Sequence, residues 1–308
     1  MPNCHLIVDS CSDLPYELVD REGITLLKFP YIEGGETFDD DLFRSVSAKE
    51  FYDGMRKGAE PSTAQLSVPL LQDTFRAAAE AGVPTVYMSF TSGLSGSFDV
   101  AMLVRDQILE EFPDFELYVV DTMLASVAEG FIVFEAISLW EKGATAKELA
   151  EWTEEAHNYV SCEFMVEDLE ALKRGGRIPS SVAVAGAALD VKPLLTIDLD
   201  GKLQLTGVAR GRKKAMRHMA DFYEKNVNTD GPTRYVFLGN ADCPKDMERL
   251  KGMIQKADPD TLFLESSIGP VIGSHTGPGM LAVVFWGDDK RENLSVADRI
   301  AKRIKGDK

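Results

Sequence analysis

The chain has 308 residues and a formal net charge of −17, with 50 Asp and Glu against 33 Lys and Arg. Its length exceeds the usual size of a single hydrophobic core, so we expect two domains. The negative charge disfavours binding to nucleic acid and to anionic lipid surfaces, and no apolar run of the sequence is long enough for stable membrane insertion.

The start of the chain and its cysteines bear on its compartment. Met-Pro-Asn-Cys-His lacks the basic and apolar regions of a secretory signal, so we expect a cytoplasmic protein. The four cysteines are scattered, without the spacing of a metal site. We therefore expect free thiols rather than a disulfide or zinc framework.

The first half of the chain alternates between strand and helix patterns. Apolar runs predict strands at 5–8, 24–29, 83–90 and 115–120. Helical spacing and capping boxes predict helices at 47–56, 69–81, 98–112, 125–142 and 145–158. This alternation indicates an α/β domain over residues 1–158, with a mainly parallel sheet and helices on both faces.

The second half, 159–308, has a different pattern. Strands are expected at 164–166, 194–197, 202–206, 234–238, 261–264 and 281–286. Helices are expected at 168–174, 210–226 and 244–257, with a surface helix in the charged tail after 288. The segment 268–279 carries four glycines and two prolines and is expected to be a loop. We interpret this half as an α+β domain with a mixed sheet.

The turn from Thr91 to Ser97 is the most informative stretch. It joins a buried strand to a helix start, where free N–H groups and the helix dipole favour an anion, and its two glycines allow close approach. It lacks the Lys of a P-loop and the third glycine of a dinucleotide loop. Residues 93–97 nearly match the G-x-S-x-G elbow of serine hydrolases. A capped helix start without any ligand is the simplest alternative.

Other polar residues could join this turn at one site. Several follow predicted parallel strands and so are expected at one sheet edge: Asp9, Ser10, Thr91, Ser92, Asp121 and Thr122. Basic residues cluster at 173–177 and 210–217, which favours a phosphate, a carboxylate or an acidic partner, although a solvated face is the alternative. His275, in the glycine-rich loop, could donate to an anion and titrate near neutral pH.

Taken in order, these motifs resemble the signatures of the DegV family. The matching segments run from the first strand to the last: Val8-Asp9-Ser10, 63–67, Thr91-Ser92-Gly93-Leu94-Ser95-Gly96, Val120-Asp121-Thr122, 168–178, Val191-Lys192-Pro193, 210–215 and 269–279. The resemblance covers essentially the whole chain.

The resemblance implies a bacterial two-domain protein that encloses one long-chain fatty acid between its domains. It implies that Thr63 and Ser92, with backbone N–H groups near Gly93, hold the carboxylate. It also implies a set of residues at the mouth that meet the head group, the acyl phosphate or a partner: His275, Arg174, Arg177 and Arg210.

Such a chain would itself be no enzyme. It would be the acyl-carrying subunit of a fatty acid kinase, with no catalytic residue, no metal and no cofactor besides its lipid. Because the sequence has no P-loop, a separate kinase subunit must bring the nucleotide and Mg²⁺, and an acyltransferase is a further candidate partner.

The chain departs from the family at the 63–67 loop, where Thr-Ser-Gln-Pro-Ser has become Thr63-Ala64-Gln65-Leu66-Ser67.

A rival hypothesis from another class is a serine hydrolase of acyl esters, with Ser92 or Ser95 as nucleophile and His275 as base. A third is a small-anion sensor without an acyl tunnel.

Overall fold

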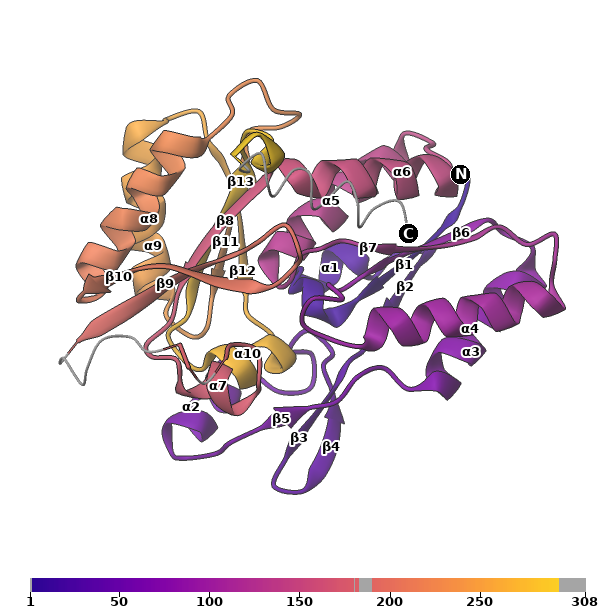
Figure 1. The fold of residues 1–308 in the computed structure, drawn as a ribbon, viewed down its shortest axis with the longest axis horizontal. Coiled ribbons are helices and arrows are strands. Elements are labelled where there is room, and N and C mark those ends of the chain that lie inside the picture. Colours follow the sequence, from indigo (N-terminus) through magenta and orange to yellow (C-terminus); the bar gives the residue numbers. More distant parts are fainter. Residues whose placement is uncertain (1, 180, 183–189, 294–308) are drawn as a thin grey trace.

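The computed structural model describes residues 2–179, 181–182 and 190–293. These residues form two large sheets and one small sheet, surrounded by helices (Figure 1). In the tail after 288, where a helix is expected, the structure describes a 3₁₀ turn, Lys290–Asn293, and the rest of that prediction lies outside the described residues.

Sheet A is parallel throughout and confirms the predicted α/β half. Its strands, in the order β2-β1-β6-β7, are β1 (His5–Asp9), β2 (Ile24–Leu27), β6 (Thr85–Ser89) and β7 (Leu117–Asp121). Helices α3 (Val68–Ala81) and α4 (Ser97–Glu111) cover one face, and α5 (Val127–Glu141) and α6 (Ala146–Ala156) lie on the other (Figure 1). Because the strands are parallel, their carboxyl ends meet at one edge.

Both predicted capping boxes start helices. Ser47 accepts the N–H of Glu50 at the start of α2 (Ala48–Arg56), and the Glu50 carboxylate accepts the N–H of Ser47 in return. Thr145 and Glu148 make the same exchange at α6. Each exchange satisfies backbone donors that a helix start otherwise leaves unpaired.

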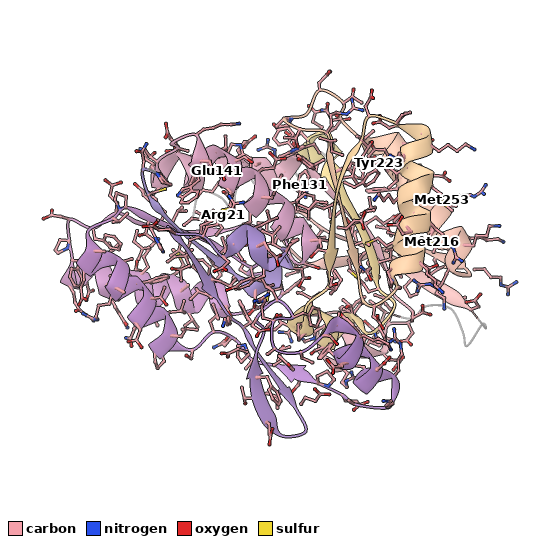
Figure 2. All side chains as sticks on the ribbon, turned by 180° about the vertical axis from the view of Figure 1, so that it is seen from behind. Arg21, Phe131, Glu141, Met216, Tyr223 and Met253 are labelled. Carbon is pink, nitrogen blue, oxygen red and sulfur yellow. The ribbon has the colours of Figure 1, made fainter. Side chains whose placement is uncertain are left out.

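Sheet C is mixed and belongs to the second half of the chain. Its order is β10-β9-β8-β13-β11-β12, from β8 (Val160–Met165), β9 (Val191–Ile197), β10 (Leu203–Arg210), β11 (Tyr235–Asn240), β12 (Leu262–Ser267) and β13 (Leu281–Trp286). Only β11 and β12 pair in parallel. Helices α8 (Arg212–Asn226) and α9 (Pro244–Ala257) cover its outer face, where Figure 2 shows Met216, Tyr223 and Met253.

Helix α5 lies between the two sheets and is apolar on nearly all sides. Phe131, which Figure 2 labels on this helix, packs edge-on against Phe237 and Trp286 of sheet C, with ring centroids 5.1 and 5.0 Å apart. The same helix contacts the 3₁₀ turn Ser10–Ser12 that follows β1. Buried residues of both halves therefore form one continuous cluster, and the domain boundary at 158 stays a prediction.

The sequence analysis missed a small antiparallel sheet. Strands β3 (Pro30–Glu33), β4 (Glu36–Asp39) and β5 (Ser62–Thr63) pair in the order β4-β3-β5. Strand β5 has only two residues, too few to give an alternating pattern in the sequence. The remaining short helices are α1 (Tyr16–Val19), the 3₁₀ turn His157–Tyr159 and α7 (Glu170–Arg174).

The prediction of a loop at 268–279 is wrong, because this segment contains helix α10 (Pro270–Thr276). Gly269 and Gly277 flank the helix, and Pro270 occupies its first turn, a position where proline is well tolerated. Gly273, inside the helix, meets a steric demand: a Cβ there would lie 2.4 Å from the Tyr52 hydroxyl oxygen. These glycines and the proline accommodate a helix packed closely on its neighbours.

The turn of the β9–β10 hairpin contacts the turn after β6. The Thr91 hydroxyl donates to the Gly201 carbonyl oxygen over 3.1 Å. A Cβ at Gly93 would lie 2.5 Å from the Gly201 carbonyl carbon, and one at Gly201 would lie 2.0 Å from Thr91 Oγ1. The two halves of the chain therefore meet here, backbone against backbone.

Replacing Gly93 by Ala should destabilise the protein by about 1–3 kcal/mol, because the added methyl group overpacks a contact made by backbone atoms. The control is Gly252→Ala in α9, where a Cβ meets no atom within 4 Å and Ala favours the helix. Urea denaturation of both variants measures the difference. Equal stability of the two variants would contradict the packing account.

Candidate functional site

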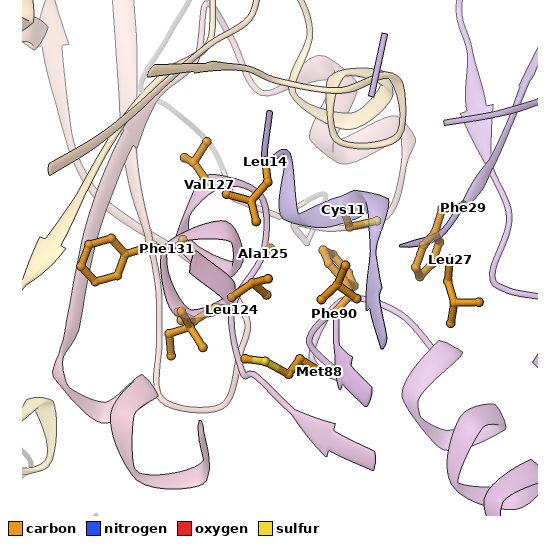
Figure 3. Close-up of a cluster of buried hydrophobic side chains, with 14 of the residues drawn as sticks. Cys11, Leu14, Leu27, Phe29, Met88, Phe90, Leu124, Ala125, Val127 and Phe131 are labelled. Carbon is orange, nitrogen blue, oxygen red and sulfur yellow. The ribbon is translucent and has the colours of Figure 1, made fainter. Parts of the chain in front are cut away.

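A cavity of about 990 Å³ of empty space, open mouth included, lies between sheet C, α5, α10 and the turn after β6. Most of its lining is apolar and comes from both halves of the chain. Figure 3 shows part of this lining, with Cys11, Phe29, Phe90, Ala125 and Val127 gathered from separate elements. Polar groups of the lining include Thr63, Gln65, Ser95, Arg177 and His275.

Thr63 and His275 meet at the cavity. Thr63 lies on β5 and His275 in the last turn of α10, and 2.8 Å separates Thr63 Oγ1 from His275 Nε2. The imidazole Nδ1 is buried and has no hydrogen-bond partner among the described residues. A Cβ at Gly175 would lie 2.0 Å from this Nδ1, so the close approach of α7 requires glycine.

His275 is a neutral imidazole at neutral pH. Burial lowers its pKa to about 4, and the charges of Arg177 and Arg174 act in the same direction. The expectation of titration near neutral pH is therefore wrong. A proton on Nδ1 would find no acceptor among the described residues, so we assign the proton to Nε2, from which it is donated to Thr63 Oγ1.

The start of α4 contributes Ser95 and Gly96 to the cavity. Ser95 Oγ donates to Ser97 Oγ over 3.0 Å and accepts the N–H of Ser97. No hydrogen bond between described residues uses the N–H groups of Ser95 and Gly96. These donors stand at the positive end of the 15-residue helix α4, where an anion is favoured.

Ser92 and Gly93 do not belong to the cavity lining. Ser92 is exposed, and its N–H donates to Asp121 Oδ2 over 3.1 Å. The N–H of Gly93 donates to Thr91 Oγ1 over 3.0 Å. The Thr91-to-Ser97 turn therefore presents Ser95 to the cavity, while Ser92 and Gly93 lie on its side toward Asp121 and the hairpin. The role predicted for Ser92 and Gly93 at a carboxylate stays a prediction.

The basic residues predicted for the mouth occupy different settings. Arg177 lines the cavity, with Nε donating to the Leu94 carbonyl oxygen and Nη1 to that of Gly175. Arg174 and Arg210 lie outside the lining. Arg174 pairs loosely with Glu60, at 3.3 Å between exposed side chains, and Arg210 is exposed at the end of β10.

Buried acids support the loops around the cavity, a role that sequence reasoning missed. Asp9 accepts the N–H groups of Cys11 and Phe90, both next to the cavity. Asp13 accepts the N–H of Gly269 over 2.8 Å, and Asp40 accepts that of Val271 over 3.2 Å, so both hold the start of α10. Burial raises the pKa of Asp9 to about 6 and that of Asp40 to about 7.

The geometry does not favour the serine hydrolase. His275 Nε2 bonds to Thr63, and Ser95 Oγ bonds to Ser97. Since His275 Nδ1 has no partner among the described residues, no acid orients this imidazole. A serine hydrolase would require a nucleophile that is hydrogen-bonded to a base, and an acid that is hydrogen-bonded to the same base and orients it.

No helix in the part of the chain that the structure describes combines the length and apolar character of a membrane span.

Comparisons with known proteins agree with one another. A family model described as "uncharacterised protein, DegV family" matches residues 3–288. A DegV domain-containing protein of Clostridium perfringens is 35% identical over 286 residues, which cover 92% of this chain and 98% of the relative.

Solved structures of DegV-like proteins have the same fold. A DegV family protein from Thermus thermophilus, described for its fatty acid binding, is 28% identical with a TM-score of 0.81 and covers 94% of this chain and 100% of its own. A stearic-acid-binding protein from Eubacterium ventriosum is 25% identical with a TM-score of 0.81, covering 96% of this chain and 100% of its own.

The lowered pKa of His275 predicts a pH effect on stability. The unfolded chain binds a proton at His275 below about pH 6.5, while the folded chain does so only near pH 4. The contribution of this neutral imidazole is thus present above pH 6.5 and lost as the pH falls toward 4. His275→Gln should lack this loss, so urea denaturation should show the stability of the wild type falling relative to the variant over that range. If the difference in stability between the wild type and His275→Gln stayed constant over this pH range, the lowered pKa of His275 would be contradicted.

Proposed function

Because the chain belongs to the DegV family, we propose that it binds one long-chain fatty acid in the cavity between its sheets and presents the carboxylate to a separate kinase. One observation carries this proposal: a mostly apolar cavity has hydroxyl groups, a neutral imidazole and a helix start within its lining. A fatty acid is divided in the same way as this lining, into an apolar tail and a polar head group. Acyl phosphate formation in lipid metabolism would be the role of the complex.

The tail would supply most of the binding free energy. Burying ~15 methylenes at roughly 0.8 kcal/mol each gives about 12 kcal/mol before the costs of association and ordering. Most residues that would contact the tail are apolar, among them Phe29, Phe90, Val127 and Ala282. The head group would then fix the register of the ligand rather than its affinity.

The carboxylate would be held by Thr63, Ser95 and the start of α4. With the His275 proton on Nε2, Thr63 Oγ1 accepts from the imidazole and keeps its own proton for the ligand. The N–H groups of Ser95 and Gly96 can add two further donors. On binding, the Ser95 hydroxyl would turn its proton from Ser97 Oγ to the carboxylate, and Ser95 is favoured over Ser92 because Ser95 lines the cavity.

Presentation would use the basic residues near the cavity. Arg177 at the lining could meet the head group or the acyl phosphate, whereas Arg174 and Arg210 would contact the acidic surface of a kinase or an acyltransferase. Phosphoryl transfer needs a nucleotide and Mg²⁺, which the kinase would bring to the complex. A cytoplasmic location suits this exchange.

Quantitative mass spectrometry of organic extracts from the purified protein tests the proposal. We expect about one fatty acid per chain, either as purified or after loading a delipidated sample with palmitate or oleate. Phosphate binding without any lipid would favour the small-anion sensor instead. Steady ester turnover that requires Ser95 would favour the hydrolase.

Ser95→Ala should weaken fatty acid retention by about ten-fold or more, because hydrogen bonds to a charged group contribute about 1.5–3 kcal/mol. Ser92→Ala is the matched comparison, because Ser92 is exposed and lies outside the cavity lining, and it should keep the wild-type affinity if Ser95 makes the contact. Competition with a fluorescent fatty acid measures both affinities. A defect in Ser92→Ala alone would restore the carboxylate role to Ser92 and Gly93.

Arg174→Ala should leave fatty acid affinity unchanged and slow kinase-coupled formation of acyl phosphate, because this guanidinium is exposed and pairs weakly with Glu60. Arg249→Ala on α9 is the control, since Arg249 is also exposed and paired with an acid. Turnover is measured with the kinase and labelled ATP. Equal rates for the two variants would refute the docking role of Arg174.

A further inference from the structure

One end of the cavity lies where sheet C is incompletely paired. Strands β8 and β9 pair only at Phe164 with Leu195 and at Met165 with Leu194. Beyond these pairs, β8 continues to Val160 along β13, and β9 continues to Ile197 along β10. The two strands therefore separate, and no ladder closes the sheet between Cys162 and Ile197.

The separation has a cause in the fold. Strand β9 leads into the hairpin turn whose Gly201 contacts Thr91 and Gly93 beside sheet A. Figure 1 shows the β9–β10 hairpin reaching from sheet C toward sheet A, away from β8. To make this contact, β9 must leave β8 after Leu195, and the hairpin covers the cavity with Ile197 and Leu203.

Two side chains fill the unpaired stretch. Thr196 Oγ1 donates to the Cys162 carbonyl oxygen over 2.7 Å, and Cys162 Sγ lies 3.7 Å from the same Oγ1. Cys162 is 5% exposed and lines the cavity. It also lines a separate surface pocket, which is otherwise formed by Ser161, Thr196, Phe222, Asn226, Asp288 and Lys290. Cys162 therefore forms the wall that separates the cavity from this pocket, and Thr196 supports it from the pocket side.

This wall lies at the far end of the cavity from the proposed head-group site. Along β13, Ala282 and Val284 line the cavity after Met280, which closely follows α10 with its His275. Val284 is in register with Cys162. The four steps along the extended chain from Met280 to Val284 span roughly 13 Å. A chain whose carboxylate meets Thr63 would therefore run along β13 toward Cys162.

We propose that Cys162 and Thr196 form the end wall of the acyl site and set the longest acyl chain that the protein accepts. The inference rests on the proposed function and adds a determinant of specificity to it. A chain that is too long would meet the wall before its carboxylate reached Thr63. Without the wall, its terminal carbons would pass between β8 and β9 into the surface pocket.

The test is competitive loading of the delipidated protein with an equimolar series of saturated fatty acids from laurate to behenate, read by mass spectrometry. Thr196→Ala and Cys162→Ala open the wall and should move the upper length limit to longer chains. Cys162→Phe fills the end of the cavity and should move the limit to shorter chains by about two to four carbons. Each methylene that is no longer buried should cost roughly four-fold in affinity.

Two controls separate a length effect from a general one. Cys4→Ala removes a buried thiol outside the cavity lining and should leave the length profile unchanged. Ser95→Ala should weaken all chain lengths alike without moving the limit. If Cys162→Phe does not fold, Thr196→Ala decides alone, since Thr196 is only partly buried.

The outcomes are distinct. A wild-type protein that takes up no member of the series would overturn the proposed function, and the end wall with it. A protein that binds the series but keeps the same length limit in the Thr196 and Cys162 variants would overturn the end wall alone.

Discussion

The contact between the hairpin turn and the turn after β6 is the constraint on which the rest of the cavity depends. It brings Gly93 and Gly201 so close that neither tolerates a side chain, and the Thr91 hydroxyl bonds to both partners. The contact joins the two halves of the chain, draws β9 away from β8 and covers the cavity with residues of the hairpin. Closure of the cavity and the incomplete pairing of sheet C therefore have one origin.

Titratable groups around the cavity act on stability in opposite directions. Burial raises the pKa of Asp9 and Asp40 above the ordinary carboxyl value, so their contribution to stability is present at low pH and is lost as the pH rises toward about 6 and 7. His275 has a lowered pKa, and its contribution is lost as the pH falls. The folded state therefore keeps the His275 imidazole uncharged near neutral pH, so Arg177 is the cationic side chain among the described residues of the lining.

Much of the fold could be predicted from the sequence, because its strands are apolar runs and its helices carry capping signals at Ser47 and Thr145. Helix α10 could not be predicted from the sequence. Its glycines reflect close packing against Tyr52 and α7, and only the folded structure brings these elements next to α10. The sequence also predicted that the Thr91-to-Ser97 turn leads into a helix, and α4 begins at Ser97. The sequence could not show which of Ser92 and Ser95 lines the cavity. The direction of each side chain depends on the turn geometry and on a hairpin more than 100 residues later.

The small sheet gives the cavity walls unequal resistance to local opening. Thr63 lies on the two-residue strand β5, which pairs only with β3 at the sheet edge. The opposite wall is built from the long ladders of β8 and β13, and α10 is held at its start by Asp13 and Asp40. Breaking two ladder pairs, the Ala64 N–H bond to Pro30 and the Thr63–His275 hydrogen bond would free the 62–65 segment while both large sheets stay intact. This local opening would expose the 62–65 segment to hydrogen exchange and to proteases. It would also open the cavity to a ligand on the side where Thr63 lies.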